Sequence, residues 1–364
     1  MLCRLTPAGL LVVACLALSS PAVAGPYLAP AGKVMVGVAG GRTSDGYARA
    51  AGRRPAVFQF FVAWDDRFGY AYRRAGDARA GLVVHLSSYN GPGTEERVTP
   101  REIALGREDS YLYALGRDFA AYGRPVYLRL FSEMNNAANP YSAYDADGTA
   151  RGAAHTQYWF RQAWRRVHLI LKGGPVARVN RRLRGLGLPR LRDVKRPSLA
   201  RPHVALQWVP MTAGAPNIAG NRPSAYWPGG RYVDWVGTDF YSRYPNFDGL
   251  SRFYHAKQYG GRPFVFGEWA MWGHDDATFM RRFFAWVSAH PRVKMLTYNQ
   301  GNEPTSEFRL YRYPRAAGEM RRALRGKRYT SAAPSPPSKR GPGLTSAGPG
   351  PGPQHGGLSR MLSR

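Results

Sequence analysis

Two glutamates stand where apolar segments of the chain end. Glu133 closes the run RPVYLRLFSE, and Glu268 closes PFVFGE just before Trp269. A carboxylate beside large apolar side chains loses hydration, so its pKa shifts unless partners hold it. Glycoside hydrolysis requires two such carboxyls. One protonates the leaving oxygen, while the other attacks or stabilises the oxocarbenium-like centre. The alternative is that each glutamate forms a salt bridge with one of the many arginines.

The elements that must position these glutamates are eight short apolar segments. They cover residues 34–40, 56–64, 81–89, 125–131, 203–211, 232–241, 263–270 and 293–299. Their near-continuous hydrophobicity is typical of parallel strands that are covered on both faces. Helical patterns stand between several of them, at 101–123, 155–172, 276–290 and 314–326.

This alternation predicts an α/β protein with one domain, a (β/α)8 TIM barrel. A doubly wound open sheet is the competing fold. That fold usually carries a glycine-rich phosphate loop after its first strand, and the segment GVAGGRTSDGY lacks the GxGxxG spacing. The pattern therefore favours the barrel.

In such barrels the reactive side chains lie at the carboxyl ends of the strands. Besides the glutamates, the polar residues expected there are His85, Asn135, Gln207, Asp239, Tyr241, Tyr298, Asn299 and Gln300. Amides, hydroxyls and ring faces suit a sugar, which has apolar C–H faces and a rim of hydroxyls. We expect Trp208 and Trp235 in the core, and Trp269 and Trp272 in a cleft wall.

The segment RPVYLRLFSEMNN, residues 124–136, resembles the acid/base strand of glycoside hydrolase family 26. These β-mannanase-type enzymes belong to a retaining clan of (β/α)8 barrels, and their strand typically reads Arg-Pro-Val, then Leu-Arg-x-x-His-Glu-Met-Asn. Residues 163–168, 232–242 and 262–270 are also similar, in the family's order. The resemblance implies that Glu133 is the general acid/base and Glu268 the nucleophile, with carboxyls about 5 to 5.5 Å apart.

The same resemblance implies three supporting residues. Arg129 would hold the site electrostatically, Tyr241 would hydrogen-bond the nucleophile and keep it ionised, and Asn135 matches the family's Asn after Glu-Met. The chain departs from the family at Ser132, which replaces the His before the acid/base. Residues 136–141 and 297–300 also lack the tryptophans that the family often has, so the sugar specificity is left open.

The first 24 residues have the pattern of a signal peptide, with an apolar core and Ala22-Val23-Ala24 before the expected cleavage point. A weaker lipobox-like pattern makes a lipid anchor at Cys15 the lesser alternative. Both cysteines lie in this leader, so the mature chain would have neither disulfides nor thiolate ligands. Residues 25–330 are predicted to form the barrel domain, and residues 331–364, rich in Pro, Gly and Ser, a disordered tail.

The chain carries 52 Lys and Arg against 23 Asp and Glu, a net charge of +29. Such a charge suggests nucleic acid, but the predicted export and the even spread of arginine favour affinity for anionic cell-surface polymers instead. Residues 173–201 are especially basic and precede the fifth predicted strand. We interpret them as a surface insertion whose charges are solvated.

The sequence offers no pattern for a metal or cofactor. Residues 145–148 resemble the opening of a calcium loop, but Gln157 occupies the place of its closing Glu, so a simple turn is expected. We therefore expect a secreted, monomeric, retaining glycoside hydrolase that cleaves a β-linked polysaccharide, with no cofactor, no nucleic acid and no transmembrane span. The alternatives are a related specificity, such as xylan or an exopolysaccharide, and a non-catalytic barrel that binds carbohydrate or anionic cell wall.

Overall fold

The computed structural model describes residues 25–41, 43–90 and 95–335 of the chain. The predicted signal peptide, with Cys15, lies outside the described residues, as does most of the predicted tail, 336–364. Within the described residues, no helix is both long enough and apolar enough to cross a membrane.

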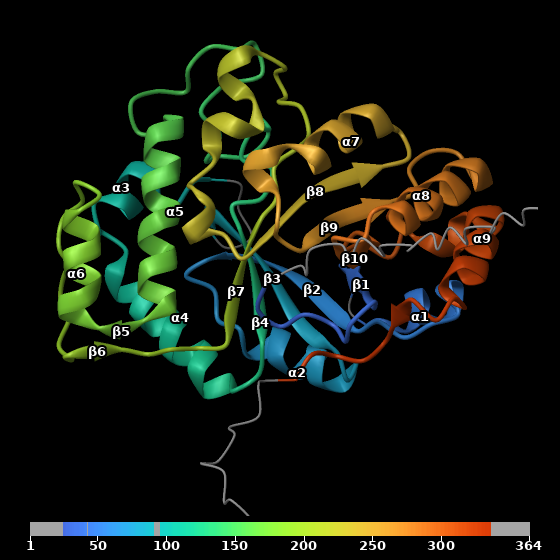
Figure 1. The fold of residues 1–364 in the computed structure, drawn as a ribbon, viewed down its shortest axis with the longest axis horizontal. Helices are drawn as coiled ribbons and strands as arrows, with labels where there is room; N and C mark the ends of the chain where they lie inside the picture. The colour runs from blue at the N-terminus through green and yellow to red at the C-terminus, as the bar shows by residue number, and fades with distance from the viewer. Residues whose placement is uncertain (1–24, 42, 91–94, 336–364) are drawn as a thin grey trace, which may run out of the picture.

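Eight parallel strands close into a barrel, as the sequence predicts (Figure 1). They are β1 (Val34–Ala39), β2 (Val57–Trp64), β3 (Gly81–Asn90), β4 (Val126–Leu130), β7 (Val204–Trp208), β8 (Trp235–Tyr241), β9 (Phe264–Ala270) and β10 (Val293–Asn299). Each pairs with its neighbour in this order, and β1 pairs with β10, with Met35 opposite Met295. A short strand, β11 (Tyr329–Thr330), also pairs with β1. The (β/α)8 TIM barrel is confirmed, with every predicted strand present.

The helices that surround the barrel are α1 (Asp45–Ala51), α2 (Gly69–Asp77), α3 (Pro100–Ala104), α4 (Asp109–Tyr122), α5 (Gln157–Lys172), α7 (Phe247–His255), α8 (Ala277–Ala289) and α9 (Pro314–Leu324). Short 3-10 turns are η1 (Ala219–Asn221), η2 (Pro223–Tyr226), η3 (Gly230–Tyr232), η4 (Lys257–Tyr259) and η5 (Leu310–Arg312). Side-chain caps start several helices: Thr156 accepts from the Trp159 N–H at the start of α5, and Asp276 accepts from Thr278 and Phe279 at the start of α8.

The single helix predicted for residues 101–123 is wrong, because two helices, α3 and α4, occupy that segment. Gly106 separates them with a φ of +82°, a backbone conformation that residues with a Cβ rarely adopt. A Cβ at this glycine would also collide with the guanidinium of Arg166. The chain must therefore turn at Gly106, although the apolar periodicity continues through it.

Side chains alternate between the barrel interior and the helix layer along the strands, apart from an irregularity in β9. The interior cluster contains Met35, Val57, Val83, Tyr127, Trp235, Val265 and Met295, whereas Trp208 packs in the larger cluster under the helices. Both Trp208 and Trp235 are fully buried, as expected. Polar interior positions occur further along the strands, toward their carboxyl ends, and this places the candidate site at that end of the barrel.

The basic segment before β7 has its own small structure. Gly174–Pro175 (β5) pairs antiparallel with Ser198–Leu199 (β6), and α6 (Val176–Arg184) stands between them. Figure 1 shows α6 outside α5, on the side of the molecule opposite α8 and α9. This segment is therefore an outer layer on the α4 and α5 side of the barrel.

Candidate active site

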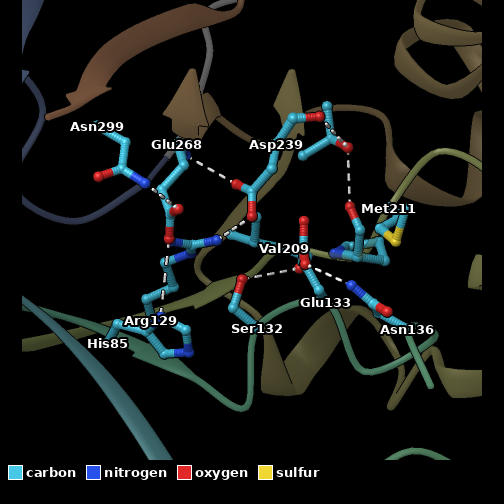
Figure 2. Close-up of polar contacts among 12 residues, drawn as sticks. His85, Arg129, Ser132, Glu133, Asn136, Val209, Met211, Asp239, Glu268 and Asn299 are labelled. Carbon is cyan, nitrogen blue, oxygen red and sulfur yellow. Dashed lines mark hydrogen bonds and ion pairs between the residues drawn. The ribbon is translucent and has the colours of Figure 1, made fainter. Parts of the chain in front are cut away.

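Glu133 lies on the loop that follows β4, and hydrogen bonds to the segment just after β7 hold this loop. Phe131 and Glu133 have φ values of +45° and +50°, a left-handed region that costs free energy for residues other than glycine. The Glu133 N–H donates to the Val209 carbonyl at 2.7 Å, and the Ser132 hydroxyl donates to the same oxygen at 3.1 Å. The Tyr141 hydroxyl donates to the Ser132 carbonyl at 2.6 Å. These bonds offset the strain and direct the Glu133 side chain toward the strand ends (Figure 2).

Ser132 and Asn135 hold this loop in place through hydrogen bonds to backbone groups. The Ser132 hydroxyl is buried and bonded to backbone, so it does not face the opening. The Asn135 amide exchanges two hydrogen bonds with the Met211 backbone, at 3.1 and 2.9 Å, and Asn221 donates to the Asn135 carbonyl at 2.9 Å. Asn135 therefore joins the loop to the segment after β7, and its side chain has little capacity left for a ligand.

The Glu133 carboxyl is partly exposed and has one hydrogen-bonding amide beside it, Asn136, whose Nδ2 donates to Oε2 at 3.0 Å. Burial and then the negative charge of Glu268 raise the pKa of Glu133, while Asn136 and the charge of Arg129 oppose the rise. The two glutamates are thus close enough to affect each other electrostatically. Glu133 is held in an environment that favours its protonated form.

Glu268 reaches the barrel interior because β9 contains an irregularity. Phe266 pairs with Leu296 of β10 and Trp269 pairs with Tyr298, so an extra residue lies between the two pairs. Gly267 and Glu268 consequently both face inward. A Cβ at Gly267 would lie 2.7 Å from Arg129 Nε, so only glycine leaves room for the guanidinium.

Side chains of neighbouring strands surround the Glu268 carboxylate, and the buried Gln59 also lies against its Oε1. Arg129 forms an ion pair with Oε1, while the Tyr241 hydroxyl and the Asn299 amide donate to Oε2 at 2.7 and 2.8 Å. His85 Nδ1 lies 3.8 Å from Oε1. Burial alone would raise the pKa of Glu268, but the charge of Arg129, with His85 and Tyr241, outweighs it and lowers the pKa well below the usual range.

Arg129 is fully buried and spans two carboxylates, since its other terminal nitrogen pairs with Asp239 (Figure 2). Asp239 Oδ1 accepts from the Glu268 N–H at 2.7 Å. Burial, together with the charges of Glu268 and Glu133, raises the pKa of Asp239 despite Arg129. Arg129 is therefore the one cation that acts on all three carboxyl groups, Glu268, Asp239 and Glu133. In a buried cluster of this kind, a proton remains on the carboxyls that the cation stabilises least.

The structure thus brings together Glu133, Glu268, Arg129, Tyr241, His85 and Asn299 at one end of the barrel, with Asn135 behind them. Two expected cleft residues lie elsewhere. Trp269 is buried and stacks on Phe283 of α8 at 4.1 Å between ring centroids. Tyr298 is also buried, 5.1 Å from the Trp269 ring. The expectation for both was wrong, because they occupy outward positions of β9 and β10.

Trp272 lies just after the end of β9, next to Tyr241. It is partly buried, and its ring centroid lies 5.8 Å from that of Tyr241, which contacts Glu268. Arg243 lies over the Trp272 ring at 4.9 Å. With His274 these residues line a hollow of about 510 Å³, so an aromatic face adjoins the carboxylate cluster.

Sequence reasoning missed one contributor, Phe61, and the partnership of another, Asp239. Asp239 was expected at a strand end, but nothing in the sequence indicated that it would share Arg129 with Glu268. Phe61 of β2 was taken only as part of an apolar strand, yet it is 38% exposed and its ring lies 5.4 Å from His85. Phe61 and His85 line a hollow of about 220 Å³ together with Ser87. The alternation of side chains along β2 could have predicted this position. It places Phe61 on the same inward face as Gln59, two residues closer to the carboxyl end of the strand.

The described residues contain no group of three or more His, Cys, Asp or Glu side chains placed to hold a metal ion. In the segment 145–148, Asp145 instead pairs with Arg151 at 2.8 Å, and Asp147 accepts from Thr149 at 2.9 Å. The observed contacts are those of a turn.

No protein-family model matches the chain, and the comparison with curated proteins found no match either. Solved structures do match. An endo-β-1,4-mannanase double mutant of Cellulomonas fimi has a TM-score of 0.53 at 15% identity, over 82% of this chain and 72% of the other. A Bacillus subtilis mannanase has a TM-score of 0.51 at 15% identity, over 85% and 91%.

A β-mannanase of Bacteroides ovatus, described as a family 26 glycoside hydrolase, has a TM-score of 0.51 at 11% identity, over 82% of this chain and 90% of the other. At such identities the similarity establishes the fold. The segment 124–136 resembles the same group of proteins in sequence. The chain is therefore similar in its (β/α)8 fold to mannanases that include a member of family 26.

Proposed function

We propose that the protein is a retaining glycoside hydrolase that cleaves a β-linked polysaccharide. The observation that carries this proposal is the pair of glutamates at one strand-end site with pKa values shifted in opposite directions, Glu133 upward and Glu268 downward. A hydrolase of this class needs one carboxyl protonated and one ionised at the same pH. Similarity to solved mannanases adds support through the fold.

In this mechanism Glu268 attacks the anomeric carbon and forms a glycosyl-enzyme ester, while Glu133 donates its proton to the departing oxygen. Glu133, now ionised, takes a proton from water, which hydrolyses the ester and restores both carboxyls. The Tyr241 hydroxyl and the Asn299 amide hold Oε2 of Glu268 at 2.7 and 2.8 Å. They orient the nucleophile, and Arg129 keeps it ionised.

The hollows beside this pair suit a sugar chain. Phe61 offers an exposed ring beside His85, and Trp272 lines the neighbouring hollow next to Tyr241. His85 Nε2 and the Ser87 hydroxyl are buried without a hydrogen-bond partner within the described part of the chain, while His85 Nδ1 faces Glu268. Such groups are available for sugar hydroxyls. β-Mannan is the first substrate to test, because the similar solved structures are mannanases.

The expected cellular site is extracellular, by removal of the predicted signal peptide at residues 1–24. N-terminal sequencing of the protein released into the medium by the producing cell tests this expectation. A mature N-terminus near Gly25 agrees with it, and retention of the full leader inside the cell contradicts it.

The deciding test is incubation of the full chain with β-mannan, xylan, β-glucan and acidic polysaccharides, read for new reducing ends and for the anomer first formed. We expect hydrolysis of at least one polymer with the β anomer as the first product. Glu133→Ala and Glu268→Ala are the matched inactive controls. Release of the α anomer, or equal activity in either variant, contradicts the proposal.

The alternative of a non-catalytic carbohydrate-binding barrel is favoured by one observation. Ser132 points its hydroxyl at the Val209 carbonyl, so the position that is His in family 26 offers no side chain to the sugar. Binding of a polysaccharide without any new reducing ends would support this alternative.

A further inference from the structure

A separate hollow, of about 570 Å³, lies away from the candidate active site. It is bordered by α4, by the end of α5 and by residues 193–200 on the way into β7. Leu112, Ile170 and Leu199 form an apolar part of its lining. Since α5 ends and β7 begins at the amino ends of the strands, this hollow is on the side of the barrel away from Glu133 and Glu268.

The polar part of the lining is mostly cationic. Arg117, Lys195 and Arg196 line the hollow, are exposed, and form no ion pair with any acid of the described residues. Asp193 is the one acidic residue in the lining. The hollow therefore offers positive charge without internal neutralisation.

The positive charge continues through the whole 173–201 segment. Its nine cations are all exposed, and they are Arg178, Arg181, Arg182, Arg184, Arg190, Arg192, Lys195, Arg196 and Arg201. Asp193 is its one acid. Like charges this dense repel one another, so an anionic ligand that bridges them is favoured electrostatically.

A buried ion pair holds this segment in place. Arg166 of α5 and Asp109 of α4 are almost completely buried and form two hydrogen bonds, at 2.7 and 2.6 Å. Arg166 also donates to the carbonyls of Pro189 and Arg190, at 2.9 and 3.2 Å. The Arg192 N–H donates to Asp109 at 2.8 Å. The cations are thus presented by an anchored segment, which lowers the entropy cost of binding.

The side chains of this segment narrow the class of ligand. Val179, Leu183, Leu188 and Leu191 are buried against the protein, and Val176, Leu186, Val194 and Leu199 are partly buried and pack on the same core, so the outer face has no apolar stripe to enter a membrane. The segment itself contains no aromatic residue, and the one aromatic side chain in the lining of the hollow, Tyr113, is partly buried with its hydroxyl donating to the Arg192 carbonyl, so there is no row of rings on which successive nucleic-acid bases could stack. What it offers is guanidinium groups, which bind carboxylates in a bidentate manner, beside an apolar surface that fits the C–H face of a sugar.

We propose that the hollow and the 173–201 segment form a binding surface for an acidic glycan, a polysaccharide with a carboxylate on each repeating sugar. Arg117, Lys195 and Arg196 form its centre. On α6, Arg178, Arg181 and Arg182 extend it along one helix face, because residues three and four apart are neighbours there. This surface is separate from the glutamate site, so the proposal stands whether or not that site cleaves glycans.

The test measures binding of polygalacturonate oligomers to the full chain by titration calorimetry at fixed ionic strength. The triple variant Arg117→Gln/Lys195→Gln/Arg196→Gln should weaken binding by about tenfold or more. The triple variant Arg178→Gln/Arg181→Gln/Arg182→Gln should weaken it less. The matched control, Arg231→Gln/Arg252→Gln/Lys257→Gln, removes the same charge from exposed residues elsewhere and should change Kd less than about twofold.

Neutral mannan oligosaccharides should not displace the bound polygalacturonate, and hydrolysis of a neutral substrate should be unchanged in the first triple variant. Equal losses in the first triple and the control would overturn the proposal, because they would reflect net charge alone. Absence of binding by the unaltered chain would also overturn it. If duplex DNA, or vesicles with anionic lipid, bound more tightly than polygalacturonate, the proposal of an acidic glycan as the ligand would be overturned.

Discussion

The two glutamates of the candidate site are held in opposite ways. Glu268 belongs to a barrel strand, is nearly buried, and has a cation and two hydrogen-bond donors on its carboxylate. Glu133 belongs to a loop in a left-handed conformation, is partly exposed, and has one amide beside it. The difference assigns their roles: the strand holds a fixed, ionised group, and the loop carries a group that can exchange its proton with solvent.

Arg129 produces this asymmetry. It pairs directly with Glu268 and Asp239 and affects Glu133 only at a distance. The ionised Glu268 in turn raises the pKa of Glu133. The difference between the two carboxyls is therefore a property of the cluster.

The largest effect is expected from Glu268→Gln, which removes the nucleophile but keeps the size of the side chain. Hydrolysis should fall by about 10⁴-fold or more, measured as the initial rate of reducing-end release on the best substrate. Tyr241→Phe, which removes one hydrogen bond to Glu268, is the milder control and should lose much less. Similar rates in Glu268→Gln and the unaltered chain would show that this carboxylate has no direct role.

Arg129→Met should remove the asymmetry and destabilise the fold. It leaves Glu268 and Asp239 buried beside one another without a cation, a loss of about 3–5 kcal/mol in the free energy of unfolding. Urea denaturation at pH 7 measures this loss. The deficit should shrink as pH falls, because the carboxylates become protonated and no longer need the cation. A loss that does not depend on pH would indicate a packing defect instead.

Glu133→Gln should slow hydrolysis by about 10²–10⁴-fold and should stabilise the fold at neutral pH. The pKa of Glu133 is raised in the folded protein, so the free energy of unfolding of the unaltered chain falls as pH rises from the unfolded pKa through the folded one. Gln cannot ionise, so the variant avoids this loss. Thermal unfolding should show a higher Tm for the variant above that range and equal Tm values at low pH.

Asn136→Ala should have a small effect that appears mainly in the pH profile of kcat/KM. The Asn136 amide stabilises the ionised form of Glu133 through the 3.0 Å hydrogen bond, so its loss raises the pKa of Glu133 further. The alkaline limb, where the acid loses its proton, should move to higher pH by less than about one unit. Movement to lower pH would contradict the assignment of that limb to Glu133.

Phe61→Ala should have the smallest effect and should act on binding. The exposed Phe61 ring lies beside His85, and no contact between it and Glu268 is found among the described residues. KM should therefore rise a few-fold, which corresponds to about 1 kcal/mol of binding free energy, and kcat should change little. Trp269→Phe is a useful comparison, because this buried ring packs on Phe283. It should lower Tm and leave KM unchanged.

The barrel could be predicted from the sequence because its strands are near-continuous apolar runs, and their order follows from alternation with helices. The orientation of side chains within a strand was harder to predict. In β9 the extra residue before Trp269 turns Glu268 inward and Trp269 outward, and no residue pattern marks that irregularity. In β10, ordinary alternation of side chains places Tyr298 outward. Its polar hydroxyl at a strand end nevertheless led to the wrong expectation that it lines the site.

Partnerships within the site were predictable only through resemblance. Arg129 and Tyr241 were expected beside the nucleophile because matching residues occur in family 26. Asp239 was not expected to share Arg129, because its contact depends on the register of β8 against β9. The role of Gly267 was also not predictable from the sequence. It becomes clear only in the structure, where the Arg129 guanidinium occupies the space that a Cβ on residue 267 would need.

The most direct test of the central claim is to trap the covalent intermediate. A 2-fluoro glycosyl fluoride of the preferred sugar should inactivate the enzyme, and intact mass measurement should show one added glycosyl group. Peptide mapping should locate the ester on Glu268, with no label in Glu268→Gln. A label on Glu133 or on another residue, or hydrolysis by a protein that forms no adduct, would contradict the account.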